Sequence, residues 1–255
     1  MAFQPDPNFI IETHELTKGF AGFTAVSNLK LRVRRGTVHA LIGPNGAGKT
    51  TVFNLLTKFL IPTSGQIYYN GRDITGDLPS HVARRGMVRS FQISAVFPHI
   101  SVLENVRIAL QQATGASYHF WKPESSLYPL HRRAEELLEQ VGLISFRDQA
   151  AGSLPYGRKR ALEIATTLAL DPEMLLLDEP MSGLGHEDIH RISDLIKSVS
   201  ANRTVLMVEH NLSVVADLSH TITVLARGKI LAEGPYETVS RNAEVMSAYM
   251  GTAHA

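Results

Sequence analysis

One run of eight residues carries the clearest chemistry in this sequence. Residues 43–50 read G-P-N-G-A-G-K-T, which fits the P-loop pattern of glycine, four residues, then glycine, lysine and serine or threonine. Three glycines let the backbone curl so that several N–H groups point at one anion. The lysine reaches the β- and γ-phosphates, and the hydroxyl ligates Mg²⁺. The pattern therefore predicts a nucleoside triphosphate site made by Gly43, Pro44, Asn45, Gly46, Ala47, Gly48, Lys49, Thr50 and Thr51.

The residues around this run have the context that a P-loop needs. Residues 37–42 are apolar and β-branched, which is typical of a strand. Residues 51–59 carry apolar side chains at helical spacing. The glycine-rich run is thus predicted to lie between a strand end and a helix start, where the helix N-terminus adds partial positive charge.

Polar residues also end three further apolar segments. Asp178 and Glu179 follow a fully apolar run, so Asp178 is placed to hold Mg²⁺ through water and Glu179 to polarise the attacking water. His210 ends the apolar segment 204–208 and is a candidate to touch the γ-phosphate. Gln92 ends the segment 87–91 and is a candidate ligand of Mg²⁺ and of the attacking water.

Strands alternate with helices around the P-loop, which predicts an α/β core. Antiparallel strands are expected at both ends of the chain, from residues 9–16 and 28–33 at the start and a hairpin near residue 227 at the end. We expect a single domain over 1–255, with a helical subdomain at about 93–165. Within it, residues 101–104 form a capping box that opens a helix. Residues 113–130 are predicted to be irregular, and their aromatic side chains either cover a local core or bind a partner.

Composition narrows the function further. Lys plus Arg total 25 against 24 for Asp plus Glu, a balance without the basic excess of a nucleic-acid binder. The chain has no cysteine, which suits a reducing compartment. No apolar run approaches the ~20 residues that cross a bilayer, so other chains would have to span a membrane.

Taken in order, these residues resemble the ATP-binding cassette (ABC) ATPases over nearly the whole chain. The finer resemblance is to the longer of the two ATPase types in bacterial branched-chain amino acid importers, through residues 89–92, 96–98, 102–106 and the tail from 232 to 251. The resemblance implies a P-loop core with an N-terminal antiparallel β subdomain and a helical subdomain. It implies ATP and Mg²⁺ as cofactors.

The resemblance also assigns roles and partners. It implies that Phe20 stacks on adenine, Gln92 couples the site to transport, Glu179 is the general base and His210 senses the γ-phosphate. Such ATPases form head-to-tail dimers, homo- or heteromeric, and dock on transmembrane permease subunits near Gln92. A substrate-binding protein acts indirectly. The expected location is the cytoplasmic face of the inner membrane.

Two positions depart from the family's pattern. The signature segment usually reads L-S-G-G-Q, whereas residues 154–158 read L-P-Y-G-R, so Pro155 stands in place of the serine. Gly185 stands where Asp or Asn is usual. One hypothesis is that Gly157, Arg158 and the following helix N-terminus compensate. The other is that a second, different ATPase supplies the working signature in a heterodimer.

Other interpretations fit less well. Residues 186–190 match the zinc-protease pattern H-E-x-x-H, with Glu209 as the one tempting third ligand. Residues 73–76 match the D-x-x-G of GTPases, but no guanine-recognition motif accompanies them. A soluble ABC ATPase of translation or DNA repair usually has two cassettes or a long insertion. A lipid-exporter cassette also remains an alternative.

Overall fold

The structure is a computed structural model that describes residues 3–90, 96–114 and 128–250. Its strands are β1 Phe9–Phe20, β2 Phe23–Leu29, β3 Arg32–Arg34, β4 Val38–Ile42, β5 Ser64–Tyr69, β6 Arg72–Asp73, β7 Met87–Ser90, β8 Met174–Asp178, β9 Thr204–Val208, β10 Thr221–Ala226 and β11 Lys229–Gly234. Its α-helices are α1 Lys49–Leu56, α2 Pro79–Arg84, α3 Val102–Thr114, α4 Tyr128–Gln140, α5 Tyr156–Leu168, α6 His186–Ser200, α7 Leu212–Leu218, α8 Tyr236–Ser240 and α9 Ala243–Met250.

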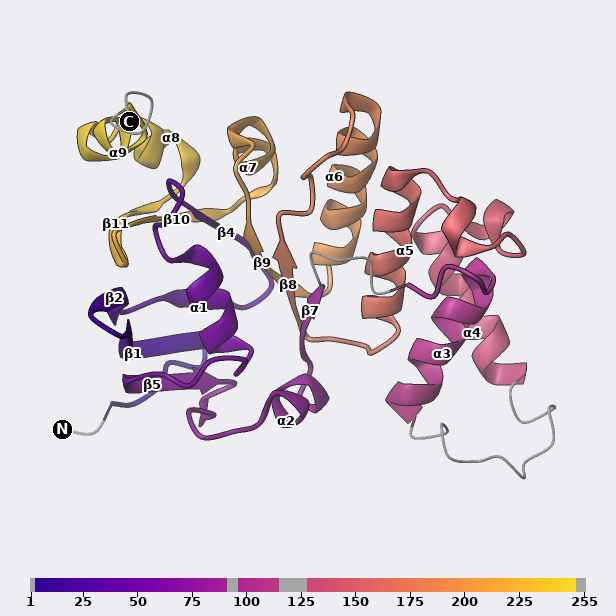
Figure 1. The fold of residues 1–255 in the computed structure, drawn as a ribbon, viewed down its shortest axis with the longest axis horizontal. Helices are drawn as coiled ribbons and strands as arrows, with labels where there is room; N and C mark the ends of the chain where they lie inside the picture. Colours follow the sequence, from indigo (N-terminus) through magenta and orange to yellow (C-terminus); the bar gives the residue numbers. More distant parts are fainter. Residues whose placement is uncertain (1–2, 91–95, 115–127, 251–255) are drawn as a thin grey trace.

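The central sheet has the order β11-β10-β4-β9-β8-β7 and runs through the middle of the molecule (Figure 1). Its strands from β10 to β7 pair in parallel, and only the edge strand β11 is antiparallel. In such a sheet, ligands bind outside the carboxyl ends of the strands. Asp178, Glu179 and His210, which end or follow β8 and β9, therefore lie at the edge of the sheet where ligands bind.

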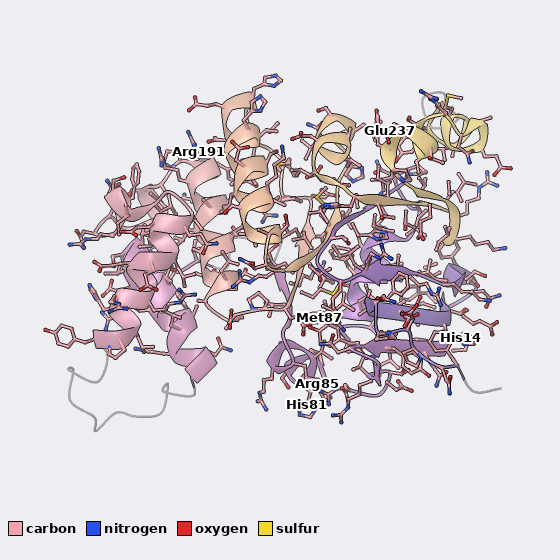
Figure 2. The ribbon with its side chains drawn as sticks, turned by 180° about the vertical axis from the view of Figure 1, so that it is seen from behind. His14, His81, Arg85, Met87, Arg191 and Glu237 are labelled. Carbon is pink, nitrogen blue, oxygen red and sulfur yellow. The ribbon has the colours of Figure 1, made fainter. Side chains whose placement is uncertain are left out.

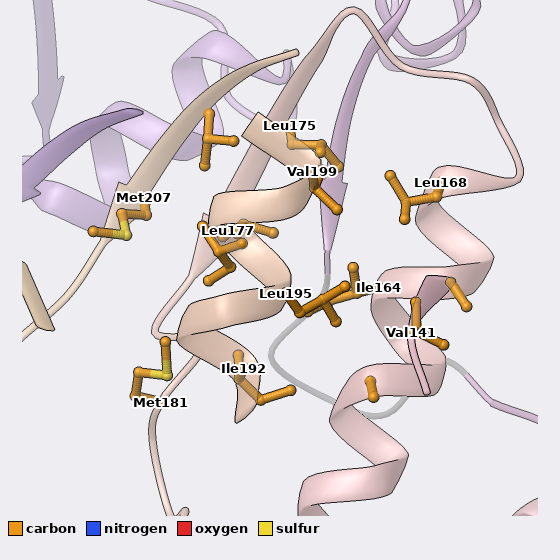
Figure 3. Packing of buried hydrophobic residues seen from close by; sticks show 14 of the residues in the cluster. Val141, Ile164, Leu168, Leu175, Leu177, Met181, Ile192, Leu195, Val199 and Met207 are labelled. Carbon is orange, nitrogen blue, oxygen red and sulfur yellow. The ribbon is translucent and has the colours of Figure 1, made fainter. Parts of the chain in front are cut away.

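The central strands divide their side chains between two hydrophobic cores because successive residues of a strand face opposite sides. In β8, Leu175 and Leu177 face one core while Met174 and Leu176 face the other. The first core includes residues of α5 and α6, and Figure 3 shows Ile164 of α5 beside Leu195 of α6. The second core joins α1 to the N-terminal sheet. A strand buried on both faces reads as a continuous apolar run, which explains the pattern in the sequence.

The N-terminal sheet has the order β2-β1-β5-β6, with β3 also paired to β1. Two expectations were wrong here. The strand predicted over 9–16 is longer than expected, because β1 continues to Phe20 and β2 then starts at Phe23. The predicted strand 28–33 is interrupted between β2 and β3, where the Thr13 hydroxyl accepts from the Leu31 N–H and donates to the Leu29 carbonyl.

The helices α3, α4 and α5 gather on the far side of α6 from the N-terminal sheet (Figure 1). Figure 2 shows the same division from behind, with Arg191 of α6 on one side, His14 on the other and Met87 between them. The capping box is confirmed, since the Ser101 N–H and hydroxyl both donate to Glu104 at 2.9 Å. Helix α4 begins at Tyr128, within the stretch predicted to be irregular. The rest of that aromatic stretch, residues 115–127, lies outside the described residues.

Two helices were not predicted. Helix α2 begins with Pro79 in its first turn, a position that proline tolerates. Helix α7 is capped by Asn211, whose side chain accepts from the N–H groups of Ser213 and Val214. Over the described ranges, no helix is both long and apolar enough to cross a bilayer.

Gly65 offers a test of how closely β1 and β5 approach. Its φ is +87°, and a Cβ atom there would lie 2.4 Å from the Glu15 carbonyl oxygen. Gly71 is a matched control, because its φ is +72° but no atom lies within 4 Å of its Cβ position. The left-handed conformation alone costs a non-glycine residue ~1–2 kcal/mol. We expect Gly71→Ala to lose about that much stability and Gly65→Ala clearly more, measured by urea unfolding. Equal losses would contradict the close approach.

Candidate functional site

The P-loop connects β4 to α1. At two of its glycines, the neighbouring backbone leaves no space for a Cβ atom. A Cβ atom at Gly43 would lie 2.2 Å from the Leu225 carbonyl oxygen, and one at Gly48 would lie 2.6 Å from the Ala25 oxygen. Both residues also have positive φ. The loop thus packs directly on the backbone of neighbouring strands, which only glycine permits.

The Lys49 side chain folds back onto the P-loop. Its ammonium donates to the carbonyl oxygens of Gly43 at 2.7 Å and Pro44 at 3.0 Å. Burial lowers the pKa of Lys49, while the negative charges of Glu179 and Asp178 act in the opposite direction. Lys49 and Glu179, which follows β8, line the same cavity.

A cavity of about 350 Å³ opens at the P-loop. It brings together residues that are far apart in the sequence. They come from the turn between β1 and β2, the P-loop, and the segments that follow β8 and β9. Its lining consists of Phe20, Phe23, Ala25, Asn45, Gly46, Ala47, Gly48, Lys49, Thr50, Thr51, Glu179 and His210. Most of the predicted nucleotide residues therefore line one cavity.

Five predicted residues lie outside this lining and one is not described. Gly43 and Pro44 belong to the P-loop but do not line the cavity. Asp178 is buried behind the cavity rather than in its lining. Gly157 and Arg158 belong to α5, outside this cavity. Gln92 lies outside the described residues. The stacking role of Phe20, the catalytic roles of Glu179 and His210, and the roles of these residues remain predictions.

Glu179 and His210 form a direct pair. His210 Nε2 lies 2.9 Å from Glu179 Oε1. The two residues follow the adjacent strands β8 and β9, in which Asp178 pairs with Val208. Glu179 has a φ of +46°, a conformation that costs a non-glycine residue ~1–2 kcal/mol. Such strain persists only where the surrounding structure fixes it, and it concentrates at functional sites.

Asp178 is held by two arginines. Its carboxylate pairs with the Arg89 guanidinium, which also donates to the Asn54 side chain of α1 at 2.6 Å. Its backbone carbonyl accepts from Arg160 of α5 at 2.9 Å. Arg89 therefore links β7, β8 and the P-loop helix, and Arg160 links them to the helix that carries the signature segment.

The signature segment has an internal packing role. A Cβ atom at Gly157 would lie 2.2 Å from Asp188 Cγ on α6, so a side chain there would have to displace the Asp188 carboxylate. Pro155 caps α5 without a side-chain hydrogen bond. The Arg158 guanidinium lies 4.1 Å from the centre of the Phe146 ring, a cation–π contact.

Some residues of the site were not predicted. Phe23 lines the cavity beside Phe20, and the pair of aromatics in one short segment was the available signal. Arg89 and Asn54 gave no pattern of their own. Tyr249 of α9 accepts a hydrogen bond from the Gly43 N–H, and burial raises its pKa to about 12. The sequence pattern suggests Glu209 only as a zinc ligand, whereas in the structure its carboxylate accepts hydrogen bonds from backbone N–H groups.

Comparison with known proteins also indicates an ATP-binding protein. A family model described as ABC transporter matches residues 26–182. Another, described as branched-chain amino acid ATP-binding cassette transporter, matches residues 229–255. The high-affinity branched-chain amino acid transport ATP-binding protein BraF of Pseudomonas aeruginosa is 38% identical, covering 96% of this chain and 98% of its own. The corresponding LivG protein of Escherichia coli is 37% identical with the same coverage.

Solved structures agree with this result. The ADP conformation of an ATP-binding cassette of an ABC transporter aligns with a TM-score of 0.83 at 29% identity, covering 95% of this chain and 99% of that one. A dimeric bacterial ABC transporter cassette aligns with a TM-score of 0.74 at 25% identity, covering 89% and 98%.

The parallel sheet, the P-loop and the Glu179–His210 pair define an ATP-binding cassette, a P-loop ATPase with an appended β sheet and helical region. The predicted fold class is therefore confirmed. The chain belongs to the ABC transporter family, in which it is an ATP-binding, ATP-hydrolysing subunit.

The buried pair of Arg89 and Asp178 leads to a stability test. Both side chains are largely buried, at 11% and 2% exposed. Breaking such a pair strands a buried charge and costs ~3–5 kcal/mol. We expect a loss of that size for Arg89→Met in urea unfolding. The control is Lys197→Met, which breaks the exposed pair with Asp217 and should cost no more than ~1 kcal/mol. Similar losses in both variants would disprove a structural role for Arg89.

Proposed function

We propose that this chain drives a bacterial importer of branched-chain or related amino acids by hydrolysing MgATP. The observation that carries the ATPase chemistry is the cavity in which the P-loop meets Glu179 and His210. The match of residues 229–255 to a branched-chain amino acid cassette family supports the substrate class. The names of BraF and LivG support it as well.

The reaction is in-line attack of water on the γ-phosphorus of ATP. The new bond joins the water oxygen to phosphorus, and the bond to the bridging oxygen of ADP breaks. Glu179 takes the proton from the water. His210 holds the Glu179 carboxylate and contacts the γ-phosphate, while Lys49 turns toward the β- and γ-phosphates. Phe20 stacks on adenine at the exposed end of the cavity, where 46% of its surface is accessible.

The residues present suit a magnesium ion. Thr50 offers a hydroxyl and Asp178 a carboxylate, both hard oxygen donors, and Mg²⁺ typically keeps several waters and takes the rest of its ligands from phosphates. Gln92 is the third proposed ligand. When bound, the ion neutralises charge on the β- and γ-phosphates. Arg89 keeps the Asp178 carboxylate oriented through their ion pair.

The transporter needs partners. We propose a head-to-tail pair of cassettes, each P-loop facing the signature segment of the other, supported by the dimeric cassette that aligns with this fold. Transmembrane permease subunits would dock near Gln92, with the chain peripheral on the cytoplasmic face of the inner membrane. Phe97 supports this surface, because 56% of a large apolar side chain is exposed there. A substrate-binding protein would act through the permease.

The catalytic assignment predicts two different defects in the transporter purified with its permease subunits. Glu179→Gln should still bind ATP but hydrolyse it ~10²–10⁴-fold more slowly, because it lacks the general base. Lys49→Ala should lose nucleotide affinity instead. Calorimetry measures binding, phosphate release measures turnover, and uptake of labelled leucine should fail with both. Near-normal turnover of Glu179→Gln would remove Glu179 from the mechanism, and normal leucine uptake without this chain would remove the substrate class.

Arg158 decides between the two hypotheses for the signature segment. If Arg158 and the α5 N-terminus replace the missing serine, Arg158→Ala should reduce transporter-coupled ATPase clearly, since a hydrogen bond to a charged group is worth ~1.5–3 kcal/mol. Because Arg158 also stacks on Phe146, Phe146→Leu is the matched control for the lost ring contact. An unchanged rate in Arg158→Ala would favour a heterodimer whose second cassette supplies the working signature.

A further inference from the structure

Glu209 is a buried carboxylate at the end of β9, immediately before His210. Only 3% of its surface is exposed. Its Oε1 accepts from the Met181 N–H at 2.8 Å. Its Oε2 accepts from the N–H groups of His210 at 2.9 Å and Asn211 at 3.2 Å. One side chain thus satisfies three backbone donors, which compensates the cost of burying its charge.

These three donors belong to two different segments. Met181 follows β8 and lies two residues after Glu179, whereas His210 and Asn211 follow β9. The last register pair between the strands is Asp178 with Val208, and the Glu179 N–H donates to the Val208 carbonyl at 2.9 Å. Beyond this point the ladder ends. Glu209 continues the connection between the two segments by means of its side chain.

The hydrogen bonds of Glu209 hold the backbone segments that carry Glu179 and His210. Glu179 has a φ of +46°, so its backbone needs fixing from both sides. Its N–H is fixed by Val208 on one side, and the chain after Pro180 is fixed by the bond from Met181 to Glu209. On the other strand, Glu209 fixes the backbone of His210 directly. Both members of the pair are therefore held by the same carboxylate.

We propose that Glu209 is a positioning residue for ATP hydrolysis, which sets the Glu179 carboxylate and the His210 ring in working geometry. The proposal rests on the roles proposed above for Glu179 and His210. A carboxylate is needed because both oxygens must accept. Glutamine has one acceptor oxygen and an NH₂ group that would face an N–H donor, so it can serve the Met181 side or the His210 side but not both.

The test is Glu209→Gln in the transporter purified with its permease subunits. We expect kcat to fall ~10–100-fold, since small displacements of catalytic groups cost about that much, while the dissociation constant for ATP stays within about twofold. The matched control is Glu12→Gln. Glu12 is similarly buried at 2% and also accepts a backbone N–H, from Asp6, but it lies in β1 of the N-terminal sheet. Its kcat should not change.

A combined variant separates positioning from a general structural defect. If Glu209 acts through Glu179 and His210, then adding Glu209→Gln to a variant that already carries both Glu179→Gln and His210→Ala should slow hydrolysis no further. An additive loss, a normal kcat in Glu209→Gln, or an equal fall in ATP affinity would overturn the proposal. If Glu209→Gln does not fold, Glu209→Asp keeps the charge but is too short to reach both segments, and the same outcomes apply. Should Glu179→Gln itself prove active, the role of Glu179 fails separately, whatever Glu209 does.

Discussion

The parallel register of three neighbouring strands is the constraint on which this site depends. In β4-β9-β8, Leu41 pairs with Val208, and Val208 pairs with Asp178. The strands therefore end at nearly the same level, because the backbone ladder fixes each strand against the next. The P-loop, the β8 exit and the β9 exit are delivered to one edge of the sheet. A slip of one residue would turn the core-facing side chains of a strand to the opposite face, so the two cores enforce this register.

The site concentrates negative charge, and each carboxylate at this edge is satisfied in a different way. Asp178 is paired with Arg89 in the interior. Glu209 is saturated by backbone N–H groups. Glu179 lines the cavity and contacts His210, which is partly exposed. The three carboxylates therefore differ in their surroundings. Of the three, Glu179 is the one that lines the cavity.

The signature segment shows how internal packing and partner recognition share residues. The Asp188 carboxylate packs against Gly157 within the same chain, so a side chain at this position would have to displace it. Arg158 rests on Phe146 within the same helical region. The N-terminus of α5 remains at the surface with Tyr156 54% exposed. Any contact with a partner must therefore be made by a helix end whose position is already set by α6 and by Phe146.

The sequence by itself determined the P-loop, the buried strands and the carboxylate and histidine that follow them, because these depend on local patterns of glycine, apolar runs and strand ends. It did not determine where β2 ends and β3 begins, since the Thr13 hydroxyl that bridges Leu29 and Leu31 belongs to β1 and reaches them only through the pairing of the strands. Nor did it indicate Arg89 or the true role of Glu209. Arg89 pairs with Asn54 and Asp178, which are 35 and 89 residues away, and the Glu209 bond that joins two segments comes from Met181, 28 residues away. Only the tertiary structure, by pairing β7, β8 and β9 in parallel, brings those charges and donors together.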